Sequence, residues 1–445
     1  MRRGNRYLRR HKGADNPSQN RDSAQRDRDR ILYSDALQRL ANVTQVATPG
    51  EGLVFHNRLT HTHEVAQIAR RLAEKLVREQ PSLAEQLGGI HPDVVEAAAL
   101  AHDLGHPPFG HIAEEELDQL ARTHGAPEGF EGNAQSFRVI TKIEAHRSEY
   151  PGLDLTGATL NAVLKYPWFR DTRAKGRVEN RYRKFGAYSS ERADFMWARR
   201  GYGDSLVQSI EAAIMDHADS IAYSVHDLDD FYRAGLIPVE NLVLGEDGEW
   251  NWFVERWGRI EPKIAYGCIE GSGDRLKNLL ADLTLGSHYR GERPQRAHLR
   301  RATSRLIDQF IHGVRLEASS AGEPGLLRDP QQLQELRFLQ ALVKVYVIYN
   351  PRLATQQAGQ REIVRRLFAT YLDATRRRLG DFVPALFRDE VTKLPKRGSH
   401  SQQLTERETR IAVDIVASFT DAQAVLLYRR LTGTDPGSIT ALLHP

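Results

Sequence analysis

The stretch AALAHDLGHPPFGH at 98–111 constrains the fold more than any other part of this sequence, because it forces a turn between two helices. The apolar run at 94–101 predicts one helix, and HIAEEELDQLA, beginning at His111, predicts a second. Between them lie residues that end a helix and favour a turn: Gly105, Pro107 and Pro108. The adjacent His102 and Asp103 therefore stand at the end of the first helix, where both side chains can converge on one cation.

Two residues cannot hold a metal ion alone, so other parts of the chain must supply ligands. The upstream segment 57–76 has apolar residues at the spacing of an amphipathic helix. Arg58 and His61 lie one turn apart near its start, so both side chains point from the same face. This helix therefore offers His61 as a candidate ligand.

A third helix is predicted downstream, at 211–231. It places Asp219, Tyr223 and Asp227 at intervals of four residues, on one face. Histidine nitrogens and carboxylate oxygens suit Mg, Mn, Fe or Zn. Buried histidines satisfied by backbone carbonyls are the alternative. Cys268 is the only cysteine, which excludes a Cys-rich zinc site and an internal disulfide.

The order His61, His102, Asp103 and Asp219 gives the pattern H…HD…D. With this pattern the sequence resembles the HD-domain metallohydrolases, and among them the deoxyguanosinetriphosphate triphosphohydrolase-like proteins. Further segments carry the same resemblance: 26–46 (RDRDRILYSDALQRLANVTQV), 129–141 (GFEGNAQSFRVIT), 164–168 (LKYPW) and 410–424 (RIAVDIVASFTDAQA).

This resemblance implies an all-α HD-domain fold with additional C-terminal helices, in agreement with the helical spacing that continues from residue 31. It also implies a divalent metal ion, Mg, Mn, Fe or Zn, held by His61, His102, Asp103 and Asp219. The implied reaction converts a deoxynucleoside triphosphate to deoxynucleoside and inorganic triphosphate, in a homo-oligomer.

His111 and Glu114 lie one turn apart at the start of the second helix, so the carboxylate can orient the imidazole. By the resemblance, His111 is the catalytic group in line with the α-phosphate. Acids also favour the first turn of a helix through its dipole, an alternative that explains Glu114 but not His111. His106 is expected to donate to a phosphate oxygen or to fill the turn.

Substrate-binding residues are predicted on four segments. Arg58 and Lys184 are candidate phosphate contacts, because both are cations. The resemblance places Tyr223 against the deoxyribose and Asp227 on the 3′-hydroxyl, and an exposed acid is the alternative for Asp227. Other candidates come from FEGNAQ and from KFGAYSSE, where a solvated loop is the alternative: Glu131, Asn133 and Tyr188.

The charge of the chain is concentrated at its start. Residues 1–30 contain ten Lys and Arg and four Asp and Glu, a net charge of +6, whereas the whole chain of 445 residues carries +4. We predict a disordered basic tail, either able to bind nucleic acid or simply solvated. No apolar run reaches the roughly 18 residues of a membrane span and no signal peptide is evident, which predicts a cytoplasmic protein without membrane contact.

Three segments are expected: the tail at 1–25, an HD-type catalytic region at 26–235, and a C-terminal helical region at 236–445 packed on the catalytic core. Apolar residues at the spacing of a helix also occur at 299–318, which predicts a helix there. Short strands or loops are candidates at 53–56 and within the first residues of the C-terminal region, LIPVENLVL.

The sequence favours hydrolysis of dGTP and other deoxynucleoside triphosphates. Two alternatives remain: an HD phosphohydrolase acting on another nucleotide, and a nucleotide-sensing or nucleic-acid-binding protein without turnover. The intact His111 and ligand set argue against the second alternative.

Overall fold

The computed structural model describes residues 6–11, 20–45, 56–171, 179–245, 248–270, 272–286, 288–318, 324–395 and 401–435. Within these ranges the chain is all-α, as predicted, apart from one small sheet. Its strands β1 (Val314–Leu316) and β2 (Leu326–Arg328) are antiparallel, with Val314 opposite Arg328.

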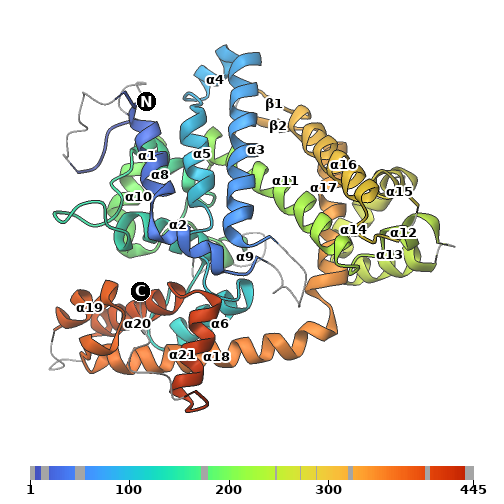
Figure 1. Cartoon of the computed structure of the whole chain (residues 1–445). Coiled ribbons are helices and arrows are strands. Elements are labelled where there is room, and N and C mark those ends of the chain that lie inside the picture. The colour runs from blue at the N-terminus through green and yellow to red at the C-terminus, as the bar shows by residue number, and fades with distance from the viewer. Residues whose placement is uncertain are drawn as a thin grey trace.

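Three helices form the centre of the catalytic region: α3 (Arg58–Glu79), α5 (Pro92–Ala101) and α11 (Ile210–Arg233) (Figure 1). α3 packs against both of the others. The end of α5 is rich in fully buried alanines, which let neighbouring helices approach closely. The buried face of α3 has the helical spacing seen in the sequence: Val65, Ile68, Leu72 and Leu76.

Shorter helices surround this centre. They are α1 (Ser23–Leu32), α2 (Asp35–Arg39), α4 (Pro81–Gln86), α6 (His111–Thr123), α7 (Gly132–Arg138), α8 (Gly157–Val163), α9 (Glu179–Arg183) and α10 (Arg192–Ala198). The break between α5 and α6 lies where the glycine and prolines predict it. α7 continues into a π-helical turn at Val139–Ile143.

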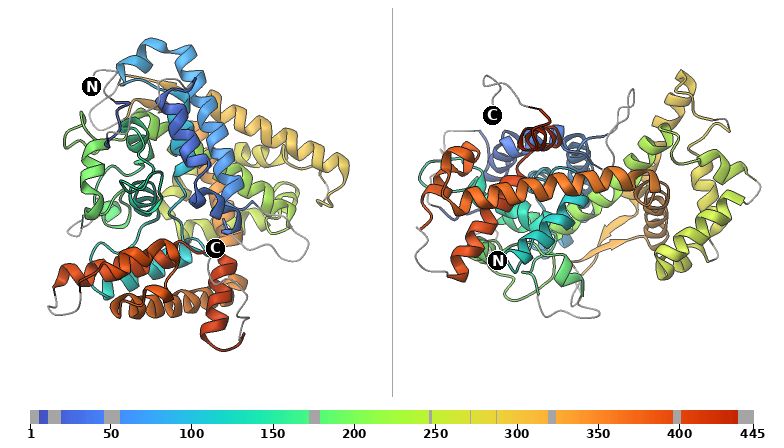
Figure 2. Two further views of the ribbon diagram at one scale, coloured as in Figure 1. Left: turned by 60° about the vertical axis from the view of Figure 1, so that its left-hand side comes forward. Right: turned by 90° about the horizontal axis from the view of Figure 1, so that it is seen from below.

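The chain beyond α11 forms two separate bodies. The first is a lobe of α12 (Val239–Leu244), α13 (Gly248–Ile260), α14 (Pro262–Ile269), α15 (Gly273–Ala281), α16 (Arg293–His312) and α17 (Pro330–Val343). The second contains α18 (Pro351–Arg376), α19 (Ala385–Thr392), α20 (Gln402–Ala417) and α21 (Asp421–Leu431). Figures 1 and 2 show the long α18 leading from the lobe to the other C-terminal helices.

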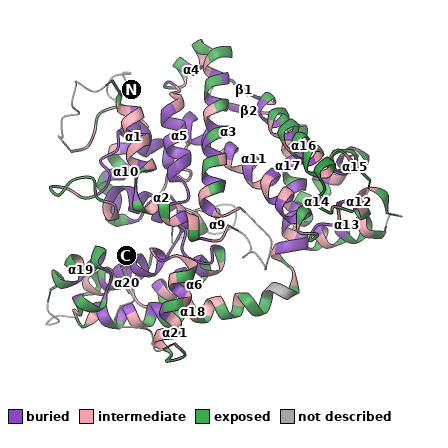
Figure 3. Ribbon diagram, viewed as in Figure 1, coloured by how far each residue is buried: buried purple, intermediate pink, exposed green. Residues whose placement is uncertain are grey.

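Each body has its own contact with the catalytic region. The lobe packs on α11 through α16 and α17 and shares the main hydrophobic core, with an aromatic cluster of its own: Trp250, Phe253, Trp257 and Phe338. The second body packs on α6 and forms a second core with Phe109, Leu117 and Phe130. The helical region expected at 236–445 thus comprises these two bodies, and Figure 3 shows buried residues in both.

Two local expectations differ from the structure. The candidate strand or loop LIPVENLVL contains α12, because Pro238 directly precedes a helical turn and suits that position. The expected helix at 299–318 ends at His312, where Gly313 follows and β1 begins. Residues 53–55 of the other candidate strand lie outside the described residues.

The described part of the N-terminal tail is ordered, contrary to expectation. Arg6 pairs with Glu211, and Arg10 pairs with Asp194. The Arg9 guanidinium lies 2.5 Å from Asp27. Carboxylates of the catalytic region neutralise these arginines and hold the segment 6–11 in place, and α1 already begins at Ser23.

No single described helix is both long and apolar enough to cross a membrane. The consecutive helices α20 and α21 reach that composition only together, across a bend of 113°.

A buried ion-pair network joins the second C-terminal body to the catalytic region. Arg138 on α7 donates to Asp414 on α20 at 2.7 Å and to Glu191 at 2.7 Å. Gln135 donates to the same Asp414 carboxylate at 2.8 Å. Asp414 and Glu191 are fully buried, so each needs these partners. The network fixes α7, whose first residues lie beside the predicted catalytic groups.

Replacing Asp414 with alanine should destabilise the protein strongly. Removal of one partner of a buried pair typically costs about 3–5 kcal/mol, because the remaining charge loses its compensation. Urea unfolding followed by circular dichroism measures the effect. Asp389→Ala removes an exposed aspartate of α19 that pairs with Lys393, and it serves as the control, for which we expect no measurable change. Equal midpoints for both variants would contradict the role of the network.

Candidate active site

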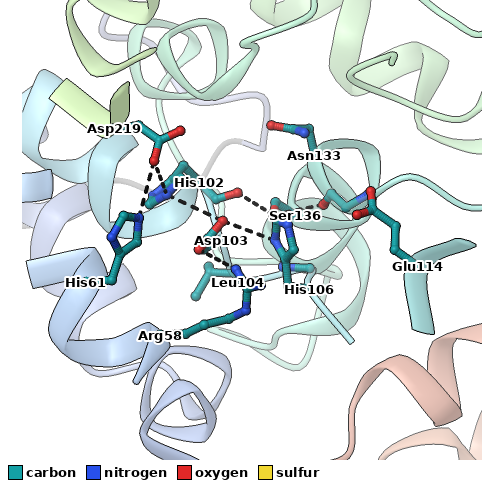
Figure 4. A network of polar contacts seen from close by, with 12 residues as sticks. Arg58, His61, His102, Asp103, Leu104, His106, Glu114, Asn133, Ser136 and Asp219 are labelled. Atoms are coloured by element: carbon teal, nitrogen blue, oxygen red, sulfur yellow. Dashed lines mark hydrogen bonds and ion pairs between the residues drawn. The ribbon is translucent and has the colours of Figure 1, made fainter. Parts of the chain in front are cut away.

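The structure brings together the four residues predicted as metal ligands (Figure 4). His61 comes from α3, His102 and Asp103 from the end of α5, and Asp219 from α11. The Asp219 Oδ1 atom lies 3.2 Å from Nε2 of His61 and 3.7 Å from Nε2 of His102. The Asp103 Oδ1 atom lies 3.4 Å from the same His102 nitrogen. Four donor atoms from three helices therefore face one another.

The donor set fits a divalent metal ion. The Nδ1 atom of His102 lies 2.6 Å from the Ala99 carbonyl oxygen, so this nitrogen carries the proton and donates. The Nε2 atom then keeps its lone pair and faces the cluster without a hydrogen-bond partner, although it is buried. A buried acceptor without a partner is costly, and a metal ion would satisfy it. His61, His102 and Asp103 each offer one ligand atom, and these three atoms lie within 4.8 Å of one another.

Each carboxylate of the cluster is held by one cation. Arg58 donates to Oδ2 of Asp103 at 2.7 Å, and Lys165 donates to Oδ2 of Asp219 at 2.9 Å. In both cases the Oδ1 atom remains directed at the cluster. Burial raises the pKa of Asp219, but Lys165 and the two imidazoles outweigh burial and hold this pKa below its ordinary value. Both carboxylates are thus kept ionised and oriented.

Arg58 and Lys165 change the assignment made from the sequence. Arg58 is almost completely buried and bound to Asp103, so in this structure it orients a ligand rather than presenting itself to a phosphate group. Lys165 was not among the predicted site residues. Its signal was present in the LKYPW segment at 164–168, where a lysine ends the run that contains α8.

His106 lies directly beside the cluster. Its Nδ1 atom is 3.1 Å from Oδ1 of Asp103. Burial and the nearby Arg58 lower the pKa of His106 to about 3, so its imidazole is neutral. A methyl group at Gly132 would lie 3.0 Å from this ring, which explains the glycine in the FEGNAQ segment. His106 is therefore packed in place, consistent with both of its predicted roles.

His111 and Glu114 form the predicted pair at the start of α6. His111 Nδ1 lies 2.9 Å from Glu114 Oε2, and the His111 side chain is 68% exposed. Glu114 is held from its other oxygen, which accepts from the backbone N–H of Gly132 at 2.9 Å. Burial raises the pKa of Glu114, but its contacts with His111 and Lys184 outweigh this and hold the pKa well below its ordinary value.

The turn before His111 is strained and is supported from the C-terminal body. Phe109 has a φ of +65°, an uncommon value for a residue with a side chain. Its backbone N–H donates to Oδ1 of Asp421 at 2.9 Å, and Asp421 begins α21. Arg39 supports the same loop by donating to the carbonyls of Leu104 at 2.9 Å and His106 at 2.8 Å. The C-terminal body therefore helps to position His111.

Lys184 connects two carboxylates near the pair. Its Nζ atom lies 3.0 Å from Oε1 of Glu131 and 3.3 Å from Oε1 of Glu114. Burial lowers the pKa of Lys184, but the two carboxylates raise it above its ordinary value, so it stays charged. Glu131 is buried and caps α7 by accepting from the backbone of Asn133 at 2.6 Å and Ala134 at 3.0 Å. Glu131 therefore holds α7 and Lys184 together.

Tyr188 does not have the exposure expected of a substrate contact. Its side chain is fully buried and packs against Phe185, while the Arg410 guanidinium stacks on its ring at 3.7 Å. Its hydroxyl accepts from the backbone N–H of Glu131 at 3.3 Å. Tyr188 thus supports the FEGNAQ segment in this structure, and its predicted contact with substrate stays a prediction.

Tyr223 and Asp227 follow Asp219 along α11. Tyr223 is half-buried, and Asp227 is buried with an Oδ2 atom that has no hydrogen-bond partner. Burial and the neighbouring Asp230 raise the pKa of Asp227 well above its ordinary value. The alternative of an exposed acid is excluded for Asp227. The free oxygen of this buried carboxyl, two turns from the metal cluster, can accept a hydrogen bond from a hydroxyl group of a ligand.

Comparisons with known proteins agree with this geometry. An HD domain is found at residues 58–224, a range that includes all four predicted ligands, and a phosphohydrolase-associated domain is found at 328–430. A deoxyguanosinetriphosphate triphosphohydrolase-like protein of Streptomyces coelicolor is 37% identical over 93% of both chains. The chain belongs to this family. Proteins of the same description from Corynebacterium efficiens and Nitrobacter hamburgensis are 33% and 34% identical, over 92% and 94% of this chain and 91% and 93% of their own.

Membership in this family makes the chain a metal-dependent phosphohydrolase. The HD domain contains the four predicted ligands, whereas the phosphohydrolase-associated domain covers α17 of the lobe together with α18 to α21 of the second body, and it supplies Asp414 and Asp421. The second domain is therefore part of the support for the active site.

Proposed function

We propose that this protein hydrolyses deoxynucleoside triphosphates, dGTP among them, to deoxynucleoside and inorganic triphosphate. The observation that carries the proposal is the face of α11, where Asp219 belongs to the metal cluster and Asp227 offers a buried, unpartnered oxygen two turns away. A nucleotide with its α-phosphate at the cluster and its sugar at Asp227 matches that spacing. The names of the related proteins support the same substrate class.

The residues around the cluster have distinct tasks in this reaction. A bound divalent metal ion lowers the pKa of water and offsets charge on phosphoryl oxygens. Glu114 orients His111 through Nδ1, so that Nε2 faces the substrate. As the bond from the α-phosphorus to the 5′-oxygen breaks, His111, protonated at Nε2, gives that proton to the leaving oxygen, and the water that joins the phosphorus releases one proton to solvent. Lys184, held by Glu114 and Glu131, provides positive charge beside the phosphates.

A direct assay tests the function. Metal-loaded protein is incubated with each of the four deoxynucleoside triphosphates, singly and mixed, and the products are separated by ion-exchange chromatography. We expect deoxynucleoside and inorganic triphosphate in equal amounts. Release of single phosphate or pyrophosphate would contradict the proposed bond cleavage. Turnover of only monophosphates or cyclic phosphodiesters would support the alternative HD phosphohydrolase.

The sugar contact gives a sharper prediction. A buried carboxyl that accepts the 3′-hydroxyl is left unpaired by an analogue without that group, which should make 2′,3′-dideoxy-GTP a poor substrate. Tyr223 on the same face should leave little room for a 2′-hydroxyl, so dGTP should be preferred to GTP. Asp227→Ala should reduce kcat/KM for dGTP and narrow its advantage over the dideoxy analogue. Equal rates of the wild type on all three nucleotides would rule out these contacts.

A further inference from the structure

The outer face of α16 carries a dense group of arginines that the proposed reaction does not use. The helix contains five arginines and one aspartate, a net charge of +4 that equals the charge of the whole chain. All five arginines are exposed, and no carboxylate pairs with any of them among the residues that the structure describes. They are Arg293, Arg296, Arg300, Arg301 and Arg305.

The arginines lie on the half of α16 that faces away from the protein. The opposite half is buried through Leu299, Ala302 and Leu306 and packs toward α11 and α3. The other exposed residues between Arg293 and Arg305 are Pro294, Ala297 and Ser304, none of which has a large apolar side chain. Figure 1 shows α16 along the outside of the lobe, and Figure 3 shows much of it exposed. The surface is therefore strongly basic and free of large apolar side chains.

Folding alone does not account for this arrangement. Arg296 and Arg300 are four residues apart, as are Arg301 and Arg305, and like charges at this spacing destabilise a helix. No described acidic side chain relieves the repulsion by pairing with them. A polyanionic partner would relieve it.

We propose that this face of α16 binds the phosphate backbone of nucleic acid. Guanidinium groups bind phosphate oxygens through two hydrogen bonds, and the row from Arg293 to Arg305 spans about 18 Å at the helical rise, enough for several consecutive phosphates. A membrane surface is a poorer match, because amphipathic helices that bind bilayers insert large apolar side chains. Contacts to phosphates alone make the binding independent of sequence.

The proposal also relocates the nucleic-acid contact expected from the N-terminal tail. The described tail arginines Arg6, Arg9 and Arg10 are already paired with carboxylates of the catalytic region. The five arginines of α16 are exposed instead. The inference does not rest on the proposed triphosphohydrolase activity, since α16 contributes no residue to the metal cluster.

Fluorescence anisotropy tests the proposal with a labelled DNA strand of about 30 nucleotides and with its duplex, at salt concentrations from about 50 to about 200 mM. Each phosphate neutralised on a single strand contributes about −0.7 to the slope of log K against log salt. Four or five contacts give a slope of about −3, so this fourfold rise in salt should weaken binding about 60-fold. The quintuple variant with all five α16 arginines changed to glutamine should bind at least about tenfold more weakly, with a correspondingly shallower slope.

A matched variant shows whether DNA binding depends on the α16 arginines or only on the net positive charge of the protein. It changes to glutamine five exposed arginines that lie on other helices or, for Arg377, directly after one: Arg71, Arg78, Arg366, Arg377 and Arg429. We expect this control to bind DNA like the wild type, and both variants to retain the wild-type hydrolytic rate without DNA. The proposal is overturned if the wild type does not bind, if the two variants weaken binding equally, or if the α16 variant binds normally. Binding to phosphatidylserine vesicles that depends on α16, without DNA binding, would assign the face to membranes instead.

Discussion

Replacing Asp103 with alanine should remove both the metal ion and the hydrolytic activity. The change deletes one ligand and one of the two negative charges of the cluster, and it leaves the buried Arg58 without its partner at 2.7 Å. Changes to residues that only orient a ligand typically cost 10–100-fold in metal affinity or activity, and loss of a ligand should exceed this. Elemental analysis of the dialysed protein and the triphosphate assay measure the two effects.

Two further variants distinguish ligand loss from misfolding. Asp103→Asn keeps the volume and an oxygen for Arg58 but lacks the charge, so it should fold and still lose the metal. Lys165→Met removes the cation on Asp219 Oδ2 and should weaken metal binding by about 10–100-fold while retaining some activity. Stoichiometric metal in either purified Asp103 variant would show that Asp103 is not a ligand.

The residues of the cluster could be predicted from the sequence because their spacing follows helical geometry. His102 and Asp103 end a helix, His61 lies near the start of another, and Asp219, Tyr223 and Asp227 repeat every fourth residue on a third. The His111 and Glu114 pair follows the same rule. Local periodicity thus predicted which side chains share a face, and the family pattern predicted which faces meet.

Contacts between distant segments were not predictable in this way. Lys165 meets Asp219 across 54 positions of the sequence, and Arg138 meets Asp414 across 276. Neither pair follows any local period. Nothing in the sequence indicated that Arg58 is buried and bound to Asp103, because this contact joins residues 45 positions apart. The same limitation affected Tyr188, because the sequence does not show that its ring is buried under Arg410.

The N-terminal tail shows a related difference. Composition predicted disorder from the excess of arginine over acids at 1–30. Composition counts only charges near in sequence, whereas Glu211 and Asp194, which pair with Arg6 and Arg10, lie far along the chain. Once these carboxylates are adjacent, the charge that favoured a solvated tail instead holds residues 6–11 against the catalytic region.

Replacing His111 with alanine should lower kcat by about 10²–10⁴-fold, the usual contribution of general acid or base catalysis, while the metal content stays unchanged. The structure explains why kcat can fall while metal binding is retained. The His111 side chain is 68% exposed, so its removal leaves no cavity in the core. Glu114 keeps its contacts with the Gly132 N–H at 2.9 Å and with Lys184 at 3.3 Å, so the surrounding carboxylate network should survive.

Three measurements on matched proteins test this role. His63→Ala removes an exposed histidine of α3, two residues from a ligand, and should keep the wild-type kcat. Glu114→Gln retains the size of the orienting group but can present an N–H to Nδ1, so it should reduce kcat and alter the pH profile with KM for dGTP little changed. Wild-type turnover by His111→Ala at equal metal content would exclude proton transfer by this imidazole, and the proton for the leaving 5′-oxygen would then have to come from another group at the cluster.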